Sequence, residues 1–467
     1  MTQLLENVTF NELALNQTAS LTRKLEQKDI ELFASVSGDI NPAHLDEDYA
    51  KDDIFHGIVG HGMWLGSLIS TVLGTILPGP GTIYLEQCIK FKKPVRIGDD
   101  VTVTVRVSDK EENRSIVTFD CACVNQNGDV VADGQAVVLA PVDKISIEAP
   151  ELPVIETRAV LHSFDELLKG TLSITPLKTA IVHPVNAHSI ISALEAQEKR
   201  FIDPVFVGPR HRIEAAAREA RVDISGIPII DTEHSHAAAQ KAVAMASAFE
   251  VEALMKGALH TEELLSAILA PASRLRTERR LSHAYLMDIP NFKKPVIITD
   301  AAVNIAPNLE EKADICRNAI NLWRSVYGDK KPKVAILAAI ETINPKMQAT
   351  LDAAALCKMA ERGQIANAIM DGPLAMDLAI SPASVEEKHI ISSVAGDADI
   401  LVMPDIESGN ILAKQLTFLG RAEAAGIVLG ARVPIIMTSR SDSPRSRLLS
   451  CALAAKLHVA RKEGRIK

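Results

Sequence analysis

The feature that most constrains the fold is an apolar stretch followed by four segments rich in β-branched residues. Residues 62–73 (GMWLGSLISTVL) are apolar almost all round, which is typical of a helix surrounded by protein rather than one lying on a surface. The four segments cover residues 82–92, 100–107, 115–124 and 130–139, and turn-forming residues separate them. The pattern predicts one helix held by an antiparallel sheet, with the N-terminus of the helix buried.

A possible acid/base pair lies just before this helix, where Asp39 and His44 flank Pro42 in the run SGDINPAH. Proline lacks an amide donor and biases the preceding residue toward extended geometry, so the run is predicted to be a loop. A loop allows both side chains to point at one water molecule, as acid/base chemistry requires. The alternative is a turn-forming aspartate beside a structurally bonded histidine. The unpaired amides at the helix start would stabilise a thioester oxygen that gains negative charge.

Together these residues resemble the MaoC-like (R)-specific enoyl-CoA hydratases over roughly residues 10–140. The matching motifs are SGDINPAH, the helix start GHGM and FKKPVRIGD at residues 91–99. The resemblance implies an α+β hot-dog fold and addition of water to a trans-2-enoyl-CoA, giving a (3R)-hydroxyacyl-CoA. It implies that Asp39 and His44 are the catalytic pair, that the Gly62 amide binds the thioester carbonyl, and that Asn41 orients the loop at the substrate. A hot-dog domain that only binds CoA or acts as a scaffold is the alternative.

A chain of 467 residues is far too long for one such domain, so two or three domains are expected. The hydrophobic periodicity of the preceding strands ends at residues 141–153. Three prolines in this segment predict an extended spacer. We therefore predict a first domain over residues 1–140, a linker over 141–174 and a second domain over 175–467.

Beyond the linker, short apolar strands alternate with helices. Strands are predicted at residues 179–182, 204–208, 295–299, 333–337, 400–402 and 433–437. This alternation is typical of an α/β domain with largely parallel sheets covered on both faces. Neither GxGxxG nor GxxxxGK[ST] occurs, so a dinucleotide-binding or P-loop domain loses its usual support.

From residue 175 to the C-terminus the sequence resembles the phosphate acetyl/butyryltransferases. The matching segments are residues 371–377, 396–410, 425–431 and 438–443. The resemblance implies two α/β lobes, the second inserted at roughly residues 290–425. In the cleft between them, an acyl group would pass reversibly between CoA and phosphate.

For the transferase chemistry, the resemblance assigns Ser439 and Arg440 to the family's Ser-Arg pair. Arginine would stabilise the oxyanion and the leaving phosphate, and serine would bond the thiol or the carbonyl. Acetyl-specific members usually carry an aspartate seven residues after this serine as the thiol base, but this chain has Ser446 there. Asp442 is the nearest carboxylate and is therefore the candidate base. A turn or helix cap is its alternative role.

Phosphate recognition is predicted for a cluster of arginines, because guanidinium groups bind phosphate well. The cluster consists of Arg274, Arg276, Arg279 and Arg280. An exposed helix surface balanced by Glu278 is the alternative. Lys256 resembles a family residue that lines the same cleft, although it could also be a lysine near the C-terminal end of a helix, next to the C-cap Gly257.

The composition is that of an ordinary soluble protein, with 47% hydrophobic and 23% charged residues. A net charge of −9 argues against a nucleic-acid-binding surface. No apolar run reaches membrane-spanning length and Met1–Phe10 does not resemble a signal peptide, so a cytoplasmic protein without membrane contact is predicted. The six cysteines lack CxxC spacing and are expected to be reduced thiols.

No metal site and no cofactor is predicted, and His234 and His236 are interpreted as part of a loop or helix start. The expected partners are acyl-CoA, CoA, and phosphate or acyl phosphate. Both resemblances imply a homo-oligomer. The predicted function is therefore a bifunctional enzyme of acyl-CoA metabolism. The alternative is an active hydratase whose transferase-like half only senses acyl-CoA or oligomerises, which Ser446 favours and the intact Ser439-Arg440 pair opposes.

Overall fold

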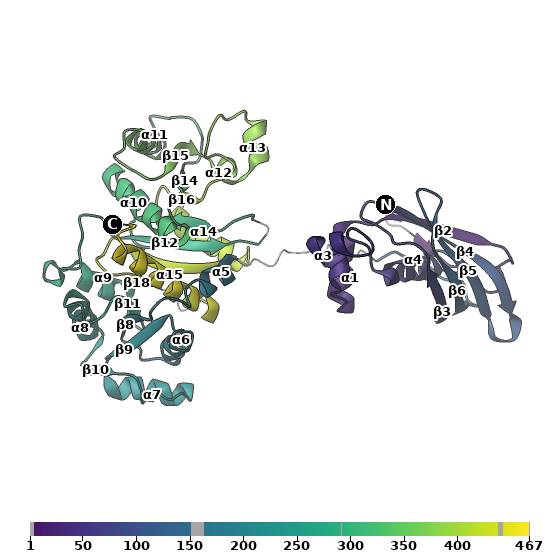
Figure 1. Ribbon diagram of the computed structural model, residues 1–467, viewed down its shortest axis with the longest axis horizontal. Helices are drawn as coiled ribbons and strands as arrows, with labels where there is room; N and C mark the ends of the chain where they lie inside the picture. Colours follow the sequence, from purple (N-terminus) through teal and green to yellow (C-terminus); the bar gives the residue numbers. More distant parts are fainter. Residues whose placement is uncertain (1–3, 151–162, 291, 438–441, 467) are drawn as a thin grey trace. The chain divides into compact units, whose positions relative to one another are not determined.

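The computed structural model describes residues 4–150, 163–290, 292–437 and 442–466. The chain divides into two compact units, Met1–Thr157 and Arg158–Lys467 (Figure 1). No helix among the described residues is long and apolar enough to cross a membrane. The six cysteines are unpaired.

The first unit is built on a five-stranded antiparallel sheet that holds one long helix. In sheet order the strands are β2 (Thr18–Lys24), β4 (Asp100–Glu111), β5 (Ile116–Asn125), β6 (Val130–Leu139) and β3 (Ile83–Phe91). The long helix is α4 (Gly62–Thr75), preceded by α1 (Gln27–Ser37), α2 (Pro42–Leu45) and α3 (Glu47–Asp52). The predicted α+β hot-dog arrangement is confirmed, and β2 is an additional edge strand.

Alternating side chains make the core of this unit. Every second residue of β4, from Val101 to Val107, is buried, and so is every second residue of β5 from Val117 to Cys123. These side chains share one face of the sheet, since strand residues alternate between faces. They pack against the buried side of α4, which includes Leu68 and Val72.

The prediction that α4 is buried all round is wrong. Its buried residues lie on one side, whereas Met63, Ser67 and Ser70 are exposed, as is Gly62 at the helix start. The reason is geometric: the sheet covers one face of the helix, and serine and threonine populate much of the other.

The segment predicted to be a linker is shorter than residues 141–174. β7 (Ser146–Glu148) pairs with β1 (Leu4–Glu6) in the first unit. In the second unit, α5 (Ser163–Lys169) packs against α15 (Pro444–Lys462), burying Phe164. Apolar side chains therefore anchor the far end of the predicted linker.

The second unit contains one eleven-stranded sheet. Its strands, in sheet order, are β10 (Ile229–Asp231), β9 (Ile202–Gly208), β8 (Leu177–Val182), β11 (Ala253–Lys256), β18 (Ile435–Ile436), β17 (Glu423–Leu429), β12 (Ser282–Asp288), β13 (Val296–Thr299), β16 (Ile400–Val402), β14 (Lys333–Leu337) and β15 (Ile369–Leu374). The predicted largely parallel α/β sheet is confirmed, but it contains antiparallel pairs in the middle, where β17 lies between β18 and β12, and β12 beside β13.

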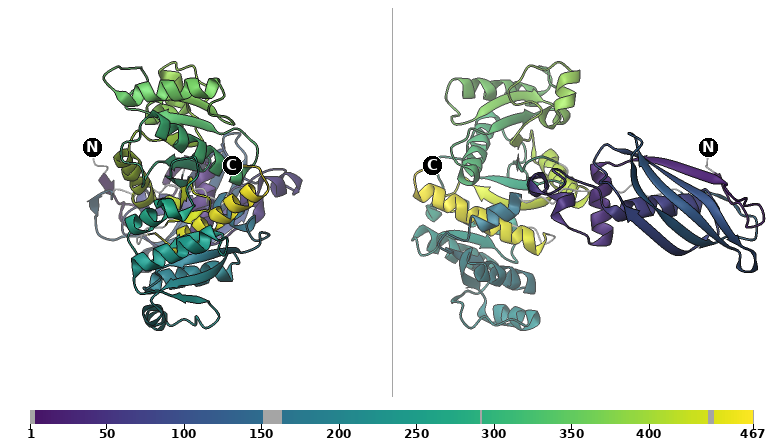
Figure 2. Two further views of the ribbon diagram at one scale, coloured as in Figure 1. Left: turned by 90° about the vertical axis from the view of Figure 1, so that its left-hand side faces the viewer. Right: turned by 45° about the vertical axis from the view of Figure 1, so that its right-hand side comes forward.

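Helices cover both faces of this sheet. They are α6 (Ala187–Glu198), α7 (Arg210–Ala220), α8 (Ser235–Ser247), α9 (Thr261–Leu269), α10 (Leu309–Tyr327), α11 (Gln348–Glu361), α12 (Met376–Ile380), α13 (Pro382–Glu387) and α14 (Ile406–Phe418), together with α5 and α15. Alternate residues of β8 belong to different cores: Ile181 packs with α6 and α7, and Ala180 with α8. Figure 2 shows α15 in yellow, which packs against β17, α6 and α10.

The chain order explains the two halves of the sheet. The strands from Ser282 to Leu429 occupy one end of the sheet order, and β18 then returns to the strands of the first half. This is the connectivity of an inserted lobe, with the inserted strands continuing the same sheet.

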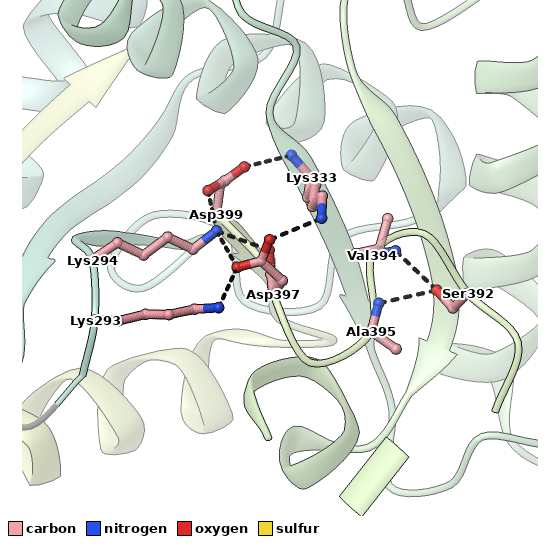
Figure 3. Close-up of polar contacts among 8 residues, drawn as sticks. All are labelled: Lys293, Lys294, Lys333, Ser392, Val394, Ala395, Asp397 and Asp399. Carbon is pink, nitrogen blue, oxygen red and sulfur yellow. Dashed lines mark hydrogen bonds and ion pairs between the residues drawn. The ribbon is translucent and has the colours of Figure 1, made fainter. Parts of the chain in front are cut away.

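An ion-pair cluster joins the beginnings of three strands of the inserted half (Figure 3). Asp397 contacts the ammonium groups of Lys293, Lys294 and Lys333 at 2.8–3.0 Å, and Asp399 also pairs with Lys294. Burial alone would raise the pKa of Asp397, but hydrogen bonds from Lys333, Lys293 and Lys294 hold it well below its ordinary value. The cluster therefore ties β13, β14 and β16 together at one edge.

Candidate active sites

The loop that carries Asp39 and His44 is partly helical, which corrects the prediction of a loop throughout. Pro42 occupies the first position of α2, where a missing amide costs nothing. The Asn41 side chain caps this turn by accepting a hydrogen bond from the Ala43 amide at 3.1 Å. Asp39 in turn accepts a hydrogen bond from the Asn41 amide at 3.2 Å. Asn41 thus shapes the segment that positions the predicted pair.

The protonation pattern of His44 follows from its partner. Its Nδ1 lies 2.8 Å from the carbonyl oxygen of Val59. A carbonyl only accepts, so Nδ1 carries the hydrogen and Nε2 of the neutral ring has a free lone pair. His44 can therefore accept a proton at Nε2.

His61 is the residue that sequence reasoning missed at this site. It is buried, its ring centroid lies 3.9 Å from that of His44, and its Nε2 lies 3.1 Å from the Asp39 carbonyl oxygen. One polar atom from each of Asp39, His44 and His61 lies within 4.8 Å of the others. The structure thus brings the predicted pair together and adds a second imidazole behind it. The GHGM motif predicts a close backbone approach at His61-Gly62 but no role for the His61 side chain.

A cavity of about 350 Å³ opens at the start of α4. His44, His61, Gly62, Leu65 and Phe91 are among its lining residues. The side chain of His61, the N-cap residue of α4, makes no capping hydrogen bond. A Cβ atom on Gly62 would lie 3.1–3.3 Å from the Phe91 ring, so glycine keeps the helix start open beside the cavity. Asp39 is exposed and does not line this cavity, but a polar atom of it lies within 4.8 Å of the lining residues His44 and His61.

A second cavity, of about 460 Å³, lies where β11 and β18 end. Its lining includes Lys256 at the end of β11, His283 and Tyr285 on β12, and Asn410 and Lys414 on α14. Both halves of the sheet therefore contribute to it. Sequence reasoning found Lys256 but assigned no role to Tyr285 or His283, whose spacing of two residues places both on one face of a strand.

The predicted Ser439 and Arg440 lie outside the described residues. The described residues on either side lie beside the second cavity. Met437 lines it. Burial, followed by the charge of Asp442, raises the pKa of Tyr285 to about 12, which shows that Asp442 is near a lining residue.

Ser446 has a structural role. It is buried near the start of α15, where its amide donates to the side chain of the N-cap residue Ser443 at 3.1 Å. The Ser443 hydroxyl donates to Ser446 Oγ at 3.0 Å. Ser446 therefore takes part in the N-terminal cap of α15. Asp442 is the carboxylate nearest in sequence to the Ser439-Arg440 motif.

The arginine cluster predicted to bind phosphate does not share this second cavity. β17 runs antiparallel to β18. The residues that follow the end of β17 therefore lie at the edge of the sheet where β11 and β18 begin. Arg279 lines a different cavity there, together with Arg461 from the last turn of α15. The 19 residues of α15 span about 28 Å and separate Arg461 from Asp442.

The other three arginines of that cluster have surface or structural roles. Arg280 pairs with Glu311 at 2.8 Å and donates to Asn304. Arg274 and Arg276 are exposed, and neither lines the second cavity. The four arginines are clustered in the sequence, but the tertiary structure places them away from the second cavity.

The prediction that His234 lies at a helix start is confirmed. His234 is the N-cap of α8, and its ring nitrogen accepts a hydrogen bond from the Ala237 amide at 3.2 Å.

Two family models match the chain, one in each unit. Residues 11–123 match the family described as MaoC like domain, and residues 235–455 match that described as Phosphate acetyl/butaryl transferase. The chain belongs to the phosphate acetyl/butyryltransferase family and carries a MaoC-like hot-dog domain in front of the transferase domain. It is therefore an enzyme with a hydratase-type part and an acyltransferase part.

Among its relatives is a phosphate acetyltransferase of Rickettsia felis, 54% identical over 309 residues that cover 64% of this chain and 88% of the relative. A branched-chain phosphotransacylase from Enterococcus faecalis V583 is similar in structure, with 30% identity, a TM-score of 0.54 and coverage of 60% of this chain and 99% of the other. The R-hydratase PhaJ1 of Pseudomonas aeruginosa is 42% identical, with a TM-score of 0.32, over 33% of this chain and 99% of its own.

Proposed function

We propose that the first unit hydrates short trans-2-enoyl-CoA thioesters to (3R)-hydroxyacyl-CoA. The observation that carries this proposal is the His44 ring, whose Nδ1 is held by the Val59 carbonyl oxygen, at a cavity that opens on the start of α4. Water bonded to Asp39 and His44 gives a proton to His44 Nε2 as its oxygen attacks C3. His44 Nε2 then gives this proton to C2, so that the hydroxyl group and the proton of one water are added across the double bond.

The start of α4 acts on the thioester carbonyl. Charge moves onto the carbonyl oxygen as water attacks, and the Gly62 amide and the helix dipole stabilise it there. The cavity volume of about 350 Å³ is at the small end for ligand pockets, which favours a short acyl chain.

The second unit, we propose, catalyses the reversible reaction of acyl-CoA with phosphate to give acyl phosphate and CoA. A phosphate oxygen bonds to the thioester carbon, the carbon–sulfur bond breaks, and the thiolate takes up a proton. In the reverse direction Asp442 accepts the thiol proton, and Arg440 with Ser439 stabilises the carbonyl oxygen. Lys256 and Lys414 supply positive charge in the cavity beside this segment.

A panel of C2 to C6 acyl-CoA and enoyl-CoA substrates, with and without phosphate, tests both activities. We expect enoyl-CoA hydration without phosphate, and release of CoA from saturated acyl-CoA only when phosphate is present. A transferase-like unit that merely senses acyl-CoA would bind it and release no CoA. The buried, cap-forming Ser446 is the one observation that favours this second candidate.

The setting of these reactions completes the proposal. The partners are acyl-CoA, CoA, phosphate and acyl phosphate, no other cofactor is required, and the location is the cytoplasm. A homo-oligomer remains our proposal from the two family resemblances, and sedimentation of the full chain would test it.

A further inference from the structure

Six arginines surround two adjoining cavities at the edge of the second unit's sheet where β11 and β18 begin. The cavities measure about 720 and 420 Å³, and both are lined by Arg279, Arg317 and Ile466. We call them together the arginine cavity. Its arginines are Arg279, Arg317, Arg324, Arg432, Arg461 and Arg465, against the two lining carboxylates of Glu278 and Asp314 among the residues described.

Three of these charges are offset by carboxylates. Arg317 pairs with Asp314 at 2.8 Å, Arg324 with Asp329 at 2.6 Å, and Arg465 with Glu463 at 2.7 Å. These pairs explain why half of the cluster can be held together without a bound anion.

The other three guanidinium groups have no ion pair with a carboxylate within the described part of the chain. Arg461 donates to the Ala431 carbonyl oxygen at 3.0 Å. The Arg432 guanidinium lies 5.2 Å from the centroid of the Phe249 ring and donates to a backbone carbonyl. These contacts position Arg432 and Arg461 without a carboxylate partner, whereas Arg279 is close enough to Asp314 and Glu278 to feel their charge although it forms no ion pair with either.

Burial makes this arrangement costly. Desolvation, and then the neighbouring Arg317, lowers the pKa of Arg279. Desolvation, and then Arg279, lowers the pKa of Arg461 to about 10. Like charges in a partly dehydrated cavity repel each other more strongly than charges on an open surface. An anion placed between them would reverse that repulsion.

We propose that the arginine cavity binds a small molecule that carries two or more phosphate groups. Guanidinium groups bind phosphate oxygens in pairs of parallel hydrogen bonds, and several converging groups match several phosphates. The larger cavity has the volume of a typical ligand site. This site is distinct from the transferase cavity because the length of α15 separates them, and it does not depend on the function proposed above.

Phe249 lies in the lining of the cavity. Its side chain is 73% exposed, and Arg432 contacts its ring, so one face is open to a planar group. An aromatic base can stack on such a ring. A nucleotide and an inorganic polyphosphate share the phosphate chemistry, and they differ in whether they use Phe249.

Calorimetric titration of the full chain tests the proposal, with ATP, tripolyphosphate and inorganic phosphate as probes. We expect saturable binding of ATP or tripolyphosphate, at least about tenfold tighter than inorganic phosphate. Arg279→Gln and Arg432→Gln should each weaken that binding at least about tenfold. Arg276→Gln is the matched control, because Arg276 is an exposed arginine of the same segment outside the cavity.

Two results would overturn the proposal: no saturable binding of either polyphosphate, or binding that all three variants weaken equally or not at all. Having two cavity variants keeps the test valid if one fails to fold. A preference for ATP that Phe249→Ala abolishes identifies a nucleotide, and equal binding of ATP and tripolyphosphate identifies the phosphates as the recognised groups. Both of these latter results support the site.

Discussion

The two candidate active sites are assembled over different lengths of chain. In the first unit, Asp39, His44, His61 and Gly62 come from one loop and the helix start that follows it. In the second unit, the cavity takes residues from position 256 to position 437, on the strands β11 and β12, the helices α9 and α14, the end of β18 and the loops between them. A local motif can specify the first site, whereas the second exists only when the sheet order is complete.

This difference predicts how the two sites respond to change. A substitution in the first site should act on its own chemistry and leave the second unit intact, because the units have separate cores.

The largest effect should follow loss of the acid/base pair. Asp39→Asn and His44→Gln should each lower kcat for enoyl-CoA hydration about 10³-fold, because positioned acid/base groups contribute about 10²–10⁴. The loss of enoyl absorbance measures it. Asp48→Asn is the control, since this exposed carboxylate lies on the next helix and should leave the rate unchanged. A rate within tenfold of wild type for both variants would remove the pair from the mechanism.

A smaller effect is expected at the candidate thiol base. Asp442→Asn should lower acyl transfer to CoA about 10²-fold, in line with the loss of a general base. Ser446→Ala is the companion variant, and it should keep most of the activity while unfolding more easily by about 1 kcal/mol, because it weakens the α15 cap. If Ser446→Ala lost activity and Asp442→Asn kept it, the two roles would have to be exchanged.

Overpacking should destabilise only the first unit. A Cβ atom on Gly60 would lie 2.7 Å from the Cδ2 atom of the fully buried Leu25, so Gly60→Ala should lower the free energy of unfolding by about 2 kcal/mol. Gly74→Ala meets no atom within 4 Å and should be neutral or slightly stabilising.

The two tryptophans of the chain allow this result to be assigned to a unit. Trp64 lies in the first unit and Trp323 in the second, so Trp323→Phe and Trp64→Phe backgrounds report each unit alone by fluorescence. Urea unfolding should show the Gly60→Ala shift only in the Trp64 signal. Equal shifts in both signals would mean that the units unfold together.

The smallest effect concerns the ion-pair cluster of the inserted half. Its pKa shift means that Asp397 binds a proton less readily when folded, so its contribution is present above about pH 4 and declines as the pH falls below that value. Asp397 is 36% exposed, so solvent screening limits the expected loss in Asp397→Asn to about 1 kcal/mol at pH 7. Unfolding followed by Trp323 at pH 7 and pH 3 should show a smaller difference between variant and wild type at pH 3. An unchanged difference would contradict the assigned pKa.

The sequence was sufficient where local rules dominate. It predicted α4 and the strands β3 to β6, because their hydrophobic patterns directly reflect which side chains are buried. It failed for β2, whose residues are mostly exposed and which has a weak pattern. It also failed for α2, where Pro42 begins a helix instead of preventing one.

The lining of the second cavity could not be predicted from the sequence, because it depends on tertiary structure. Arg279 and Lys256 lie closer in sequence than Lys256 and Met437, yet Lys256 shares a cavity with Met437 and not with Arg279. Strand direction decides this: Arg279 comes just before the start of β12, which lies at the edge where β18 begins, whereas Lys256 is at the end of β11 on the opposite edge. The stacking of His61 on His44 likewise depends on how the loop folds back onto the helix start.

We propose that one chain carries two independent centres that act on CoA thioesters. The most direct measurement is to assay hydration and phosphate-dependent CoA release on the same samples of wild type, Asp39→Asn and Asp442→Asn. We expect wild type to have both activities, and each variant to lose one activity while keeping the other within about twofold of wild type. Loss of both activities in either variant, or a wild type without CoA release, would contradict it.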